Sequence, residues 1–125
     1  MRLLVDTNVL LWVLTDDPKL SARAARLLSD PTNTLFVSAI SLAEMHVKKR
    51  IGKLKIPKDI ESELVALGFQ WLPLLQTHAP WLSELPLHHR DPFDRMLIAQ
   101  AIEEGMSIVT SDDEFEHYPV SVIRN

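Results

Sequence analysis

The stretch Leu3-Leu4-Val5-Asp6-Thr7-Asn8, followed by the apolar run Val9–Leu14, decides the fold. An apolar run as short as residues 3–5 is typical of a strand buried on both faces of a sheet. Asp6 then lies at the carboxyl end of that strand, and Asp, Thr and Asn all suit the cap of a following helix. Because ligands bind at the carboxyl ends of strands in open α/β sheets, Asp6 is placed at the mouth of a site. The simpler alternative is that Asp6 only caps a helix.

Strands and helices alternate along the rest of the chain. The sequence predicts strands at residues 2–6, 35–37, 69–72, 106–110 and 120–123. It predicts helices at residues 7–14, 21–28, 41–51, 57–67, 77–85 and 91–104. This alternation indicates an α/β fold, with a central, mainly parallel sheet covered by helices on both faces. The length of 125 residues suits a single domain spanning 1–125.

Composition limits the class of protein. Hydrophobic residues make up 46% and charged residues 24% of the chain, as in soluble globular proteins. The chain has no cysteine, which excludes disulfides and thiolate metal sites. No apolar run approaches the roughly 20 residues that span a bilayer, and the N-terminus lacks signal-peptide features. We therefore expect a cytoplasmic protein that is neither exported nor membrane-bound.

The net charge of −4, from 17 acidic and 13 basic residues, has the wrong sign for simple electrostatic binding of nucleic acid. If four of the acidic residues hold metal ions, 13 acidic and 13 basic residues are left. The densest basic segment consists of Lys48, Lys49, Arg50, Lys53, Lys55 and Lys58. Such a segment is usually a solvated helix end, but as a group it is the best candidate for an edge that contacts phosphate.

Glu44 is the most informative residue of the helix predicted over 41–51. The apolar residues Ile40, Ala43, Val47 and Ile51 recur with helical spacing, and Glu44 falls inside that stripe. A carboxylate on a buried face is costly unless it is paired or binds a metal. Glu44 therefore either pairs with a buried arginine, reaches out at the edge of the stripe, or belongs to a site.

Asp94 and Asp112 complete the set of candidate acids. Asp91 is suited to cap the helix that follows it, and Asp94, in the first turn, heads a stripe that points toward the core. Asp112 follows the strand predicted at 106–110, which repeats the opening pattern of strand and acid. The preceding His88-His89-Arg90 is a weak metal signal, and we interpret it as a polar loop.

Four acids converge if the first and fourth strands are neighbours: Asp6, Glu44, Asp94 and Asp112. Clustered carboxylates repel one another unless a cation compensates. An all-oxygen ligand set favours Mg²⁺ or Mn²⁺, which can activate water and clamp the oxygens of a phosphoryl displacement. The sequence signals no Ser–His or Cys–His nucleophile, and 3 glycines are too few for a Gly-rich phosphate loop.

The chain resembles PIN-domain proteins, and more narrowly the VapC-type ribonuclease toxins of toxin–antitoxin systems. Four stretches in the family's order and spacing carry the resemblance, which covers essentially the whole chain. They are Leu4-Val5-Asp6-Thr7-Asn8, Ser38-Ala39-Ile40-Ser41-Leu42-Ala43-Glu44, His89-Arg90-Asp91-Pro92-Phe93-Asp94-Arg95-Met96-Leu97-Ile98-Ala99-Gln100-Ala101 and Val109-Thr110-Ser111-Asp112.

The resemblance implies a three-layer α/β/α domain and a Mg²⁺- or Mn²⁺-dependent endoribonuclease acting on tRNA or another single-stranded RNA region. The catalytic, metal-binding acids would be Asp6, Glu44, Asp94 and Asp112, with Asp113 as an alternative fourth acid. The supporting polar residues would be Thr7, Asn8 and Thr110, and RNA could run along Lys48, Lys49, Arg50 and Lys53. The family also implies homodimers and a VapB-type antitoxin that inserts a peptide into the site.

Two other functions compete with the nuclease. In an aspartyl-phosphate phosphatase, Asp6 would be the nucleophile, but that chemistry usually needs an acid where this chain has Asn8. A non-catalytic PIN-like module would bind RNA or protein without cleaving. DNA also stays open as a substrate, because the metal chemistry does not itself read a 2′-hydroxyl.

Overall fold

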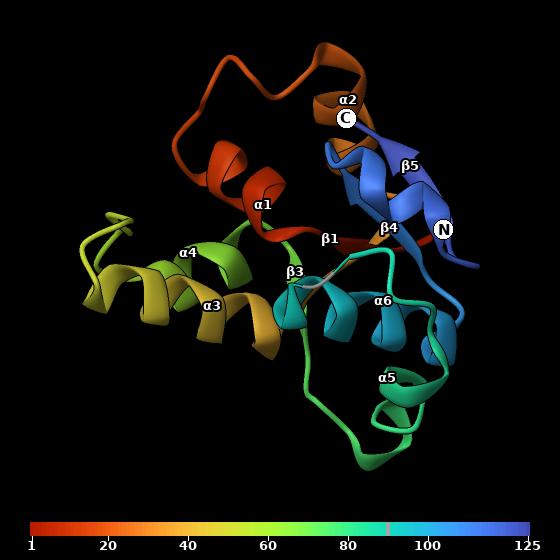
Figure 1. The fold of residues 1–125 in the computed structure, drawn as a ribbon. Helices are drawn as coiled ribbons and strands as arrows, with labels where there is room; N and C mark the ends of the chain where they lie inside the picture. Colours follow the sequence, from red (N-terminus) through yellow and green to blue (C-terminus); the bar gives the residue numbers. More distant parts are fainter. Residues whose placement is uncertain (90) are drawn as a thin grey trace.

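The computed structural model describes residues 1–89 and 91–125 and contains one five-stranded sheet (Figure 1). The strands are β1 (Arg2–Val5), β2 (Thr34–Ser38), β3 (Phe69–Leu72), β4 (Ser107–Thr110) and β5 (Ser121–Arg124). Their order is β3-β2-β1-β4-β5, and every neighbouring pair is parallel. The α/β class is confirmed, and β1 and β4 are neighbours, which is the condition under which the four acids are expected to converge.

Helices cover both faces of this sheet. They are α1 (Thr7–Leu14), α2 (Ala22–Ser29), α3 (Ala39–Arg50), α4 (Ile60–Ala66), α5 (Trp81–Glu84) and α6 (Pro92–Glu104). Two short 3-10 segments, Gln76–His78 and Asp113–His117, complete the described elements. In Figure 1, α5 and α6 lie on one side of the strands, and α1 and α2 lie on the other.

Alternate residues of each strand point to opposite faces of the sheet and pack into two separate cores, as the pleat of a strand requires. Leu4 and Ile108 pack with α6, whereas Leu3, Val5 and Val109 pack with α1 and α4. All five of these side chains are fully buried. A strand buried on both faces reads as a continuous apolar run, which is why residues 3–5 signal the fold so clearly.

Two predicted helices are shorter than expected. The segment predicted as one helix over 77–85 is the 3-10 segment Gln76–His78 followed by the four-residue α5. Pro80 lies between them, and a proline lacks the N–H that would continue the helix. The helix predicted over 57–67 is limited to α4, which begins after Asp59, and Asp59 makes no side-chain capping bond.

The stripe predicted for α3 is wrong. Val47 and Ile51 are exposed, at 48% and 59%, and Ala43 is also exposed. The buried face of α3 consists instead of Ile40, Ser41, Glu44 and Met45. Glu44 is therefore buried as expected, but among polar neighbours rather than inside an apolar stripe.

The topology places the site. From β1 the chain runs outward to β2 and β3 on one side, then returns to β4 and β5 on the other. The switch point lies between β1 and β4, where crevices form outside the carboxyl ends of the strands. Among the helices of the described residues, none has the length and apolar character needed to cross a membrane.

Candidate metal-dependent active site

Asp6 lies at the centre of the site. It follows β1 and caps α1, and one carboxylate oxygen, Oδ1, accepts a hydrogen bond from the backbone N–H of Thr7 at 2.7 Å. The other oxygen, Oδ2, accepts from the hydroxyl of Thr110, also at 2.7 Å. Burial nevertheless raises the pKa of Asp6 to about 6. The two hydrogen bonds lower this pKa, and the negative charges of Glu44 and Asp112 raise it further.

Glu44 joins this centre through Thr7. The Thr7 hydroxyl donates to Glu44 Oε1 at 2.9 Å and lies 3.0 Å from the hydroxyl of Ser41. The second oxygen, Oε2, lies 2.6 Å from Lys48 Nζ, one helical turn further along α3. Lys48 therefore supplies the counter-charge for a buried glutamate. The hydrogen bond to Glu44 and the nearby acids raise the pKa of Lys48.

Asp94 enters from the first turn of α6. Asp91 caps this helix by accepting from the backbone N–H groups of Phe93 and Asp94, and Pro92 occupies its first turn, as predicted. Asp94 Oδ2 contacts His89 Nε2 at 2.6 Å. Burial raises the pKa of Asp94 to about 7, and the charges of Asp6, Asp91 and Glu44 add to the rise, while the hydrogen bond from His89 opposes it.

Asp112, and not Asp113, faces the other acids. Its backbone N–H donates to the Thr110 hydroxyl at 3.0 Å, and its Oδ2 lies 3.6 Å from His89 Nε2. Asp113 instead pairs with Arg124, and its side chain is 77% exposed. Thr110 thus links Asp6 to Asp112, and the fourth acid of the cluster is Asp112.

The other predicted residues lie further out. Lys49, Arg50 and Lys53 are exposed at and beyond the end of α3, so only Lys48 of this group reaches an acid of the cluster. Asn8 is exposed, and its side chain makes no hydrogen bond within residues 1–89 and 91–125. The polar residues that do support the acids are Thr7, Thr110 and Ser41, and sequence reasoning did not single out Ser41.

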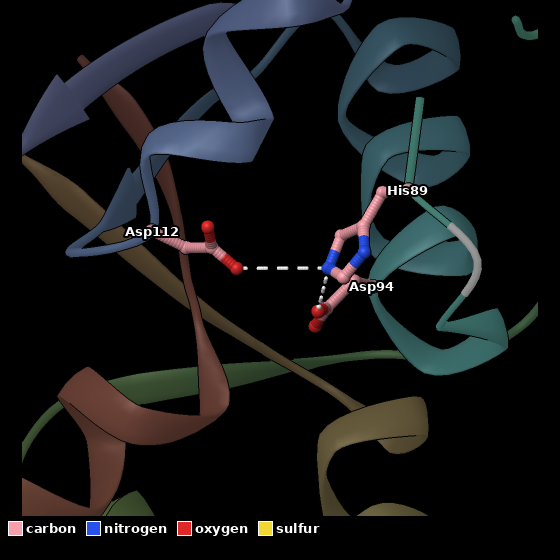
Figure 2. A group of neighbouring side chains, drawn as sticks. All are labelled: His89, Asp94 and Asp112. Carbon is pink, nitrogen blue, oxygen red and sulfur yellow. Dashed lines mark hydrogen bonds and ion pairs between the residues drawn. The ribbon is translucent and has the colours of Figure 1, made fainter. Parts of the chain in front are cut away.

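Sequence reasoning also missed His89. Figure 2 shows its ring between Asp94 and Asp112, in contact with both. Its neighbour His88 is exposed and lies against the rings of His117 and Tyr118. Arg90 lies outside the described residues. The signal that could have found His89 is its place in the short loop leading into the helix whose first turn carries Asp94.

The donor set suits a hard divalent cation. Among the described residues, one oxygen each of Asp94 and Asp112 and one ring nitrogen of His89 lie within 4.8 Å of one another. Two nearby carboxylates have raised pKa values because negative charge is gathered in a buried place. A divalent cation would neutralise that charge, and carboxylate oxygens are the ligands that Mg²⁺ prefers.

Solved structures of other proteins share this fold. One similar structure is a chain of VapBC2 from Rickettsia felis, which was solved bound to a DNA fragment from the VapBC2 promoter. It superimposes with a TM-score of 0.75 at 20% identity, covering 99% of this chain and 98% of that one. DNA-bound VapBC from Salmonella typhimurium gives a TM-score of 0.70 at 18% identity, with coverage of 99% and 98%. A toxin–antitoxin complex from Klebsiella pneumoniae gives 0.65 at 21% identity, with coverage of 96% and 94%.

At these identities the structural likenesses show the fold alone. Comparison with curated proteins gives no match. The model of the PIN domain family matches residues 3–120, which is almost the whole chain. The chain therefore belongs to the PIN-domain family.

Proposed function

We propose that the protein is a Mg²⁺- or Mn²⁺-dependent endoribonuclease that hydrolyses RNA phosphodiester bonds. The observation that carries the proposal is the meeting of Asp6, Glu44, Asp94 and Asp112 at one edge of the sheet. Each comes from a different segment of the chain, and charges of other members of the group add to the raised pKa values of Asp6 and Asp94. A packed structure keeps such a repulsive group only at a cost in stability, and perturbed carboxylates in a cleft are typical of functional sites.

The four acids would hold the cation directly or through water. Thr7 and Thr110 fix the orientations of Glu44 and Asp6, so the carboxylates keep their positions without depending on the ion. A bound Mg²⁺ or Mn²⁺ would activate water as the nucleophile and neutralise charge that develops on the phosphate. Asn8 would support the site only from its exposed edge.

RNA would approach along the basic end of α3. Lys48 is held by Glu44 next to the acids, and Lys49, Arg50 and Lys53 continue the positive charge into solvent. Exposed lysine and arginine side chains contribute to nucleic-acid binding through phosphate contacts, which carry no sequence information. The proposed substrate is tRNA or another single-stranded RNA region.

The protein would be the toxin of a VapBC-type pair, active in the cytoplasm as a homodimer. The structural neighbours include chains of VapBC and of another toxin–antitoxin complex, which supports a VapB-type antitoxin as partner. An antitoxin peptide that presents an arginine or lysine to the acids would occupy the position proposed for the cation. Such a contact would neutralise the same buried charge.

The geometry disfavours the phosphatase. As a nucleophile, Asp6 would need room for a phosphate group beside its carboxylate, but the residue is only 5% exposed. Asn8 stands where an acid is needed and faces solvent. A non-catalytic binding module is the remaining alternative, and the four clustered acids argue against it because binding alone does not need them.

The test is cleavage of a mixed pool of tRNA and single-stranded RNA by antitoxin-free protein in Mg²⁺, Mn²⁺ or EDTA. The variants are Asp6→Asn and Glu44→Gln, with Asp113→Asn as a matched control outside the cluster. We expect metal-dependent cleavage by the parent and the control. We expect losses in the two cluster variants of about a hundredfold or more, since even supporting residues of metal sites cost up to roughly that factor.

Circular dichroism would first establish that each protein is folded. Folded, metal-loaded parent that cuts no RNA would overturn the nuclease in favour of the binding module. A trapped phosphate on Asp6 would overturn it in favour of the phosphatase. Cleavage that persists in EDTA would exclude the proposed metal chemistry.

A further inference from the structure

His89 reaches the acidic cluster although the four acids account for the proposed metal site without it. Its Nε2 atom lies 2.6 Å from Asp94 Oδ2 and 3.6 Å from Asp112 Oδ2. The side chain is 21% exposed, and the carboxylates it contacts come from α6 and from the segment after β4 (Figure 2). The imidazole therefore spans the gap between two acids that no protein hydrogen bond joins directly.

The fold holds His89 in this place. The Tyr118 hydroxyl accepts a hydrogen bond from the backbone N–H of His89 at 2.7 Å and lies 3.3 Å from its carbonyl oxygen. The buried guanidinium of Arg95 donates to the same hydroxyl and to the carbonyl oxygens of Leu82, Leu85 and Pro86. The backbone leading to His89 is thus fixed from two sides.

The donor separations match those around one cation. Ligands at about 2.1 Å from an octahedral ion lie about 3.0 Å apart when adjacent and about 4.2 Å apart when opposite. The nitrogen of His89 is 2.6 Å and 3.6 Å from its two carboxylate partners, and all three donor atoms lie within 4.8 Å of one another. A small movement of three side chains would bring these atoms around a single ion.

We propose that His89 is a nitrogen ligand of the divalent cation, and that it biases the site toward a first-row transition ion such as Mn²⁺ or Co²⁺ over Mg²⁺. This inference rests on the proposed function, because it assumes that the acids hold a cation. Mg²⁺ favours oxygen ligands, whereas imidazole suits ions later in the first transition row, and the affinity of a site with nitrogen and oxygen donors rises from Mn²⁺ to Co²⁺. An all-carboxylate site would lack this source of selectivity.

A hydrogen-bonding role for His89 is the competing explanation. In that case His89 would orient Asp94, as it does in the metal-free protein, and would never touch the ion. Loss of an orienting residue can also weaken metal binding, so affinity alone does not separate the two roles. Direct detection of a nitrogen next to the metal does separate them.

The experiment uses pulsed electron paramagnetic resonance of Mn²⁺ bound to protein with isotopically labelled histidine. Titration calorimetry with Mn²⁺ and with Mg²⁺ accompanies it. The proteins are the parent, His89→Asn and His88→Asn, the last being a matched control because His88 is the exposed neighbour. Circular dichroism verifies folding. Tyr118→Phe removes the hydroxyl that holds the His89 backbone and leaves every proposed metal ligand in place.

We expect coupling between Mn²⁺ and a histidine nitrogen in the parent and in His88→Asn, and its loss in His89→Asn. The Mn²⁺ affinity of His89→Asn should fall about tenfold, with a much smaller change for Mg²⁺. Tyr118→Phe should keep the coupling and weaken Mn²⁺ binding by less than His89→Asn.

Absence of nitrogen coupling in Mn²⁺-loaded parent would overturn the inference and leave His89 as an orienting residue. Equal losses of Mn²⁺ and Mg²⁺ affinity in His89→Asn would overturn the selectivity. Parent that binds neither ion would overturn the proposed metal site itself, and with it the basis of this inference. The failure of His89 as a ligand and the failure of the nuclease are therefore separate results.

Discussion

Replacing Asp94 with Asn should stabilise the metal-free protein at neutral pH while abolishing its proposed activity. Asp94 is a charge placed where charge is unfavourable: burial raises its pKa from 3.8 to about 7, and three neighbouring acids add to the rise. Asn has nearly the same shape and can still accept a hydrogen bond from His89. The substitution therefore removes the charge and keeps most of the packing.

The magnitude follows from linkage between folding and protonation. Because the folded state holds the Asp94 proton more tightly than the unfolded state, stability is lost as the pH rises from 3.8 through about 7. The loss is less than about 1 kcal/mol at about pH 4 and reaches about 4 kcal/mol at about pH 8. Burying the new amide costs about 1 kcal/mol, so the net gain at about pH 8 is roughly 3 kcal/mol.

Urea unfolding in EDTA, followed by circular dichroism, measures this difference by linear extrapolation. Asp113→Asn is the control, because Asp113 is exposed and pairs with Arg124 at the surface, and its change should stay within about 0.5 kcal/mol. The reasoning is refuted if Asp94→Asn is no more stable than the parent at about pH 8, or if its advantage is the same at about pH 4. Added Mn²⁺ should reverse the ranking, because it binds the parent more tightly and stabilises it by mass action.

Two further variants test the contacts that hold the acids in place. Thr110→Val leaves a buried oxygen of Asp6 without its hydroxyl donor, so the free energy of unfolding should fall by about 1–3 kcal/mol relative to Thr110→Ser, and equal stability of the two would contradict this hydrogen bond. Lys48→Met removes the cation beside buried Glu44 and should destabilise the metal-free protein by about 1–2 kcal/mol, a value discounted because Lys48 is 40% exposed. Lys49→Met, on the same helix but exposed, should change stability by less than about 0.5 kcal/mol, and thermal melts showing similar losses for both lysines would argue against the pairing.

The sheet and the meeting of the acids could be predicted because their signals are local. Short apolar runs such as residues 3–5 mark buried parallel strands, and Asp6 and Asp112 follow strands directly. Once β1 and β4 are neighbours, their carboxyl ends must share an edge, so both acids lie at the same edge of the sheet. Asp91 marks the start of α6 in the sequence, and the first turn of this helix places Asp94 near the same edge of the sheet.

The buried face of α3 could not be predicted from hydrophobic periodicity. That face carries Ser41 and Glu44, whose partner is Thr7 on α1, and a hydrogen-bonded polar face gives no apolar pattern. Val47 and Ile51 supply the apolar pattern instead but are exposed. Burial of Glu44 was therefore predicted correctly for an incorrect reason.

The position of His89 was missed for a different reason. Its direction is set by Tyr118, 29 residues further along the chain, and by Arg95, which anchors the loop from within α6. Neither contact leaves a local signal in the loop sequence. His88 and His89 look alike in the sequence, and tertiary contacts alone make one exposed and the other a neighbour of two acids.

Anomalous diffraction from crystals grown with Mn²⁺ tests whether the clustered acids form one divalent-metal site. We expect an anomalous peak bounded by Asp6, Asp94 and Asp112, and no such peak in Asp94→Asn crystals grown in the same way. Fully occupied Mn²⁺ elsewhere on the protein, with none at this edge of the sheet, would show that the acids do not form such a site.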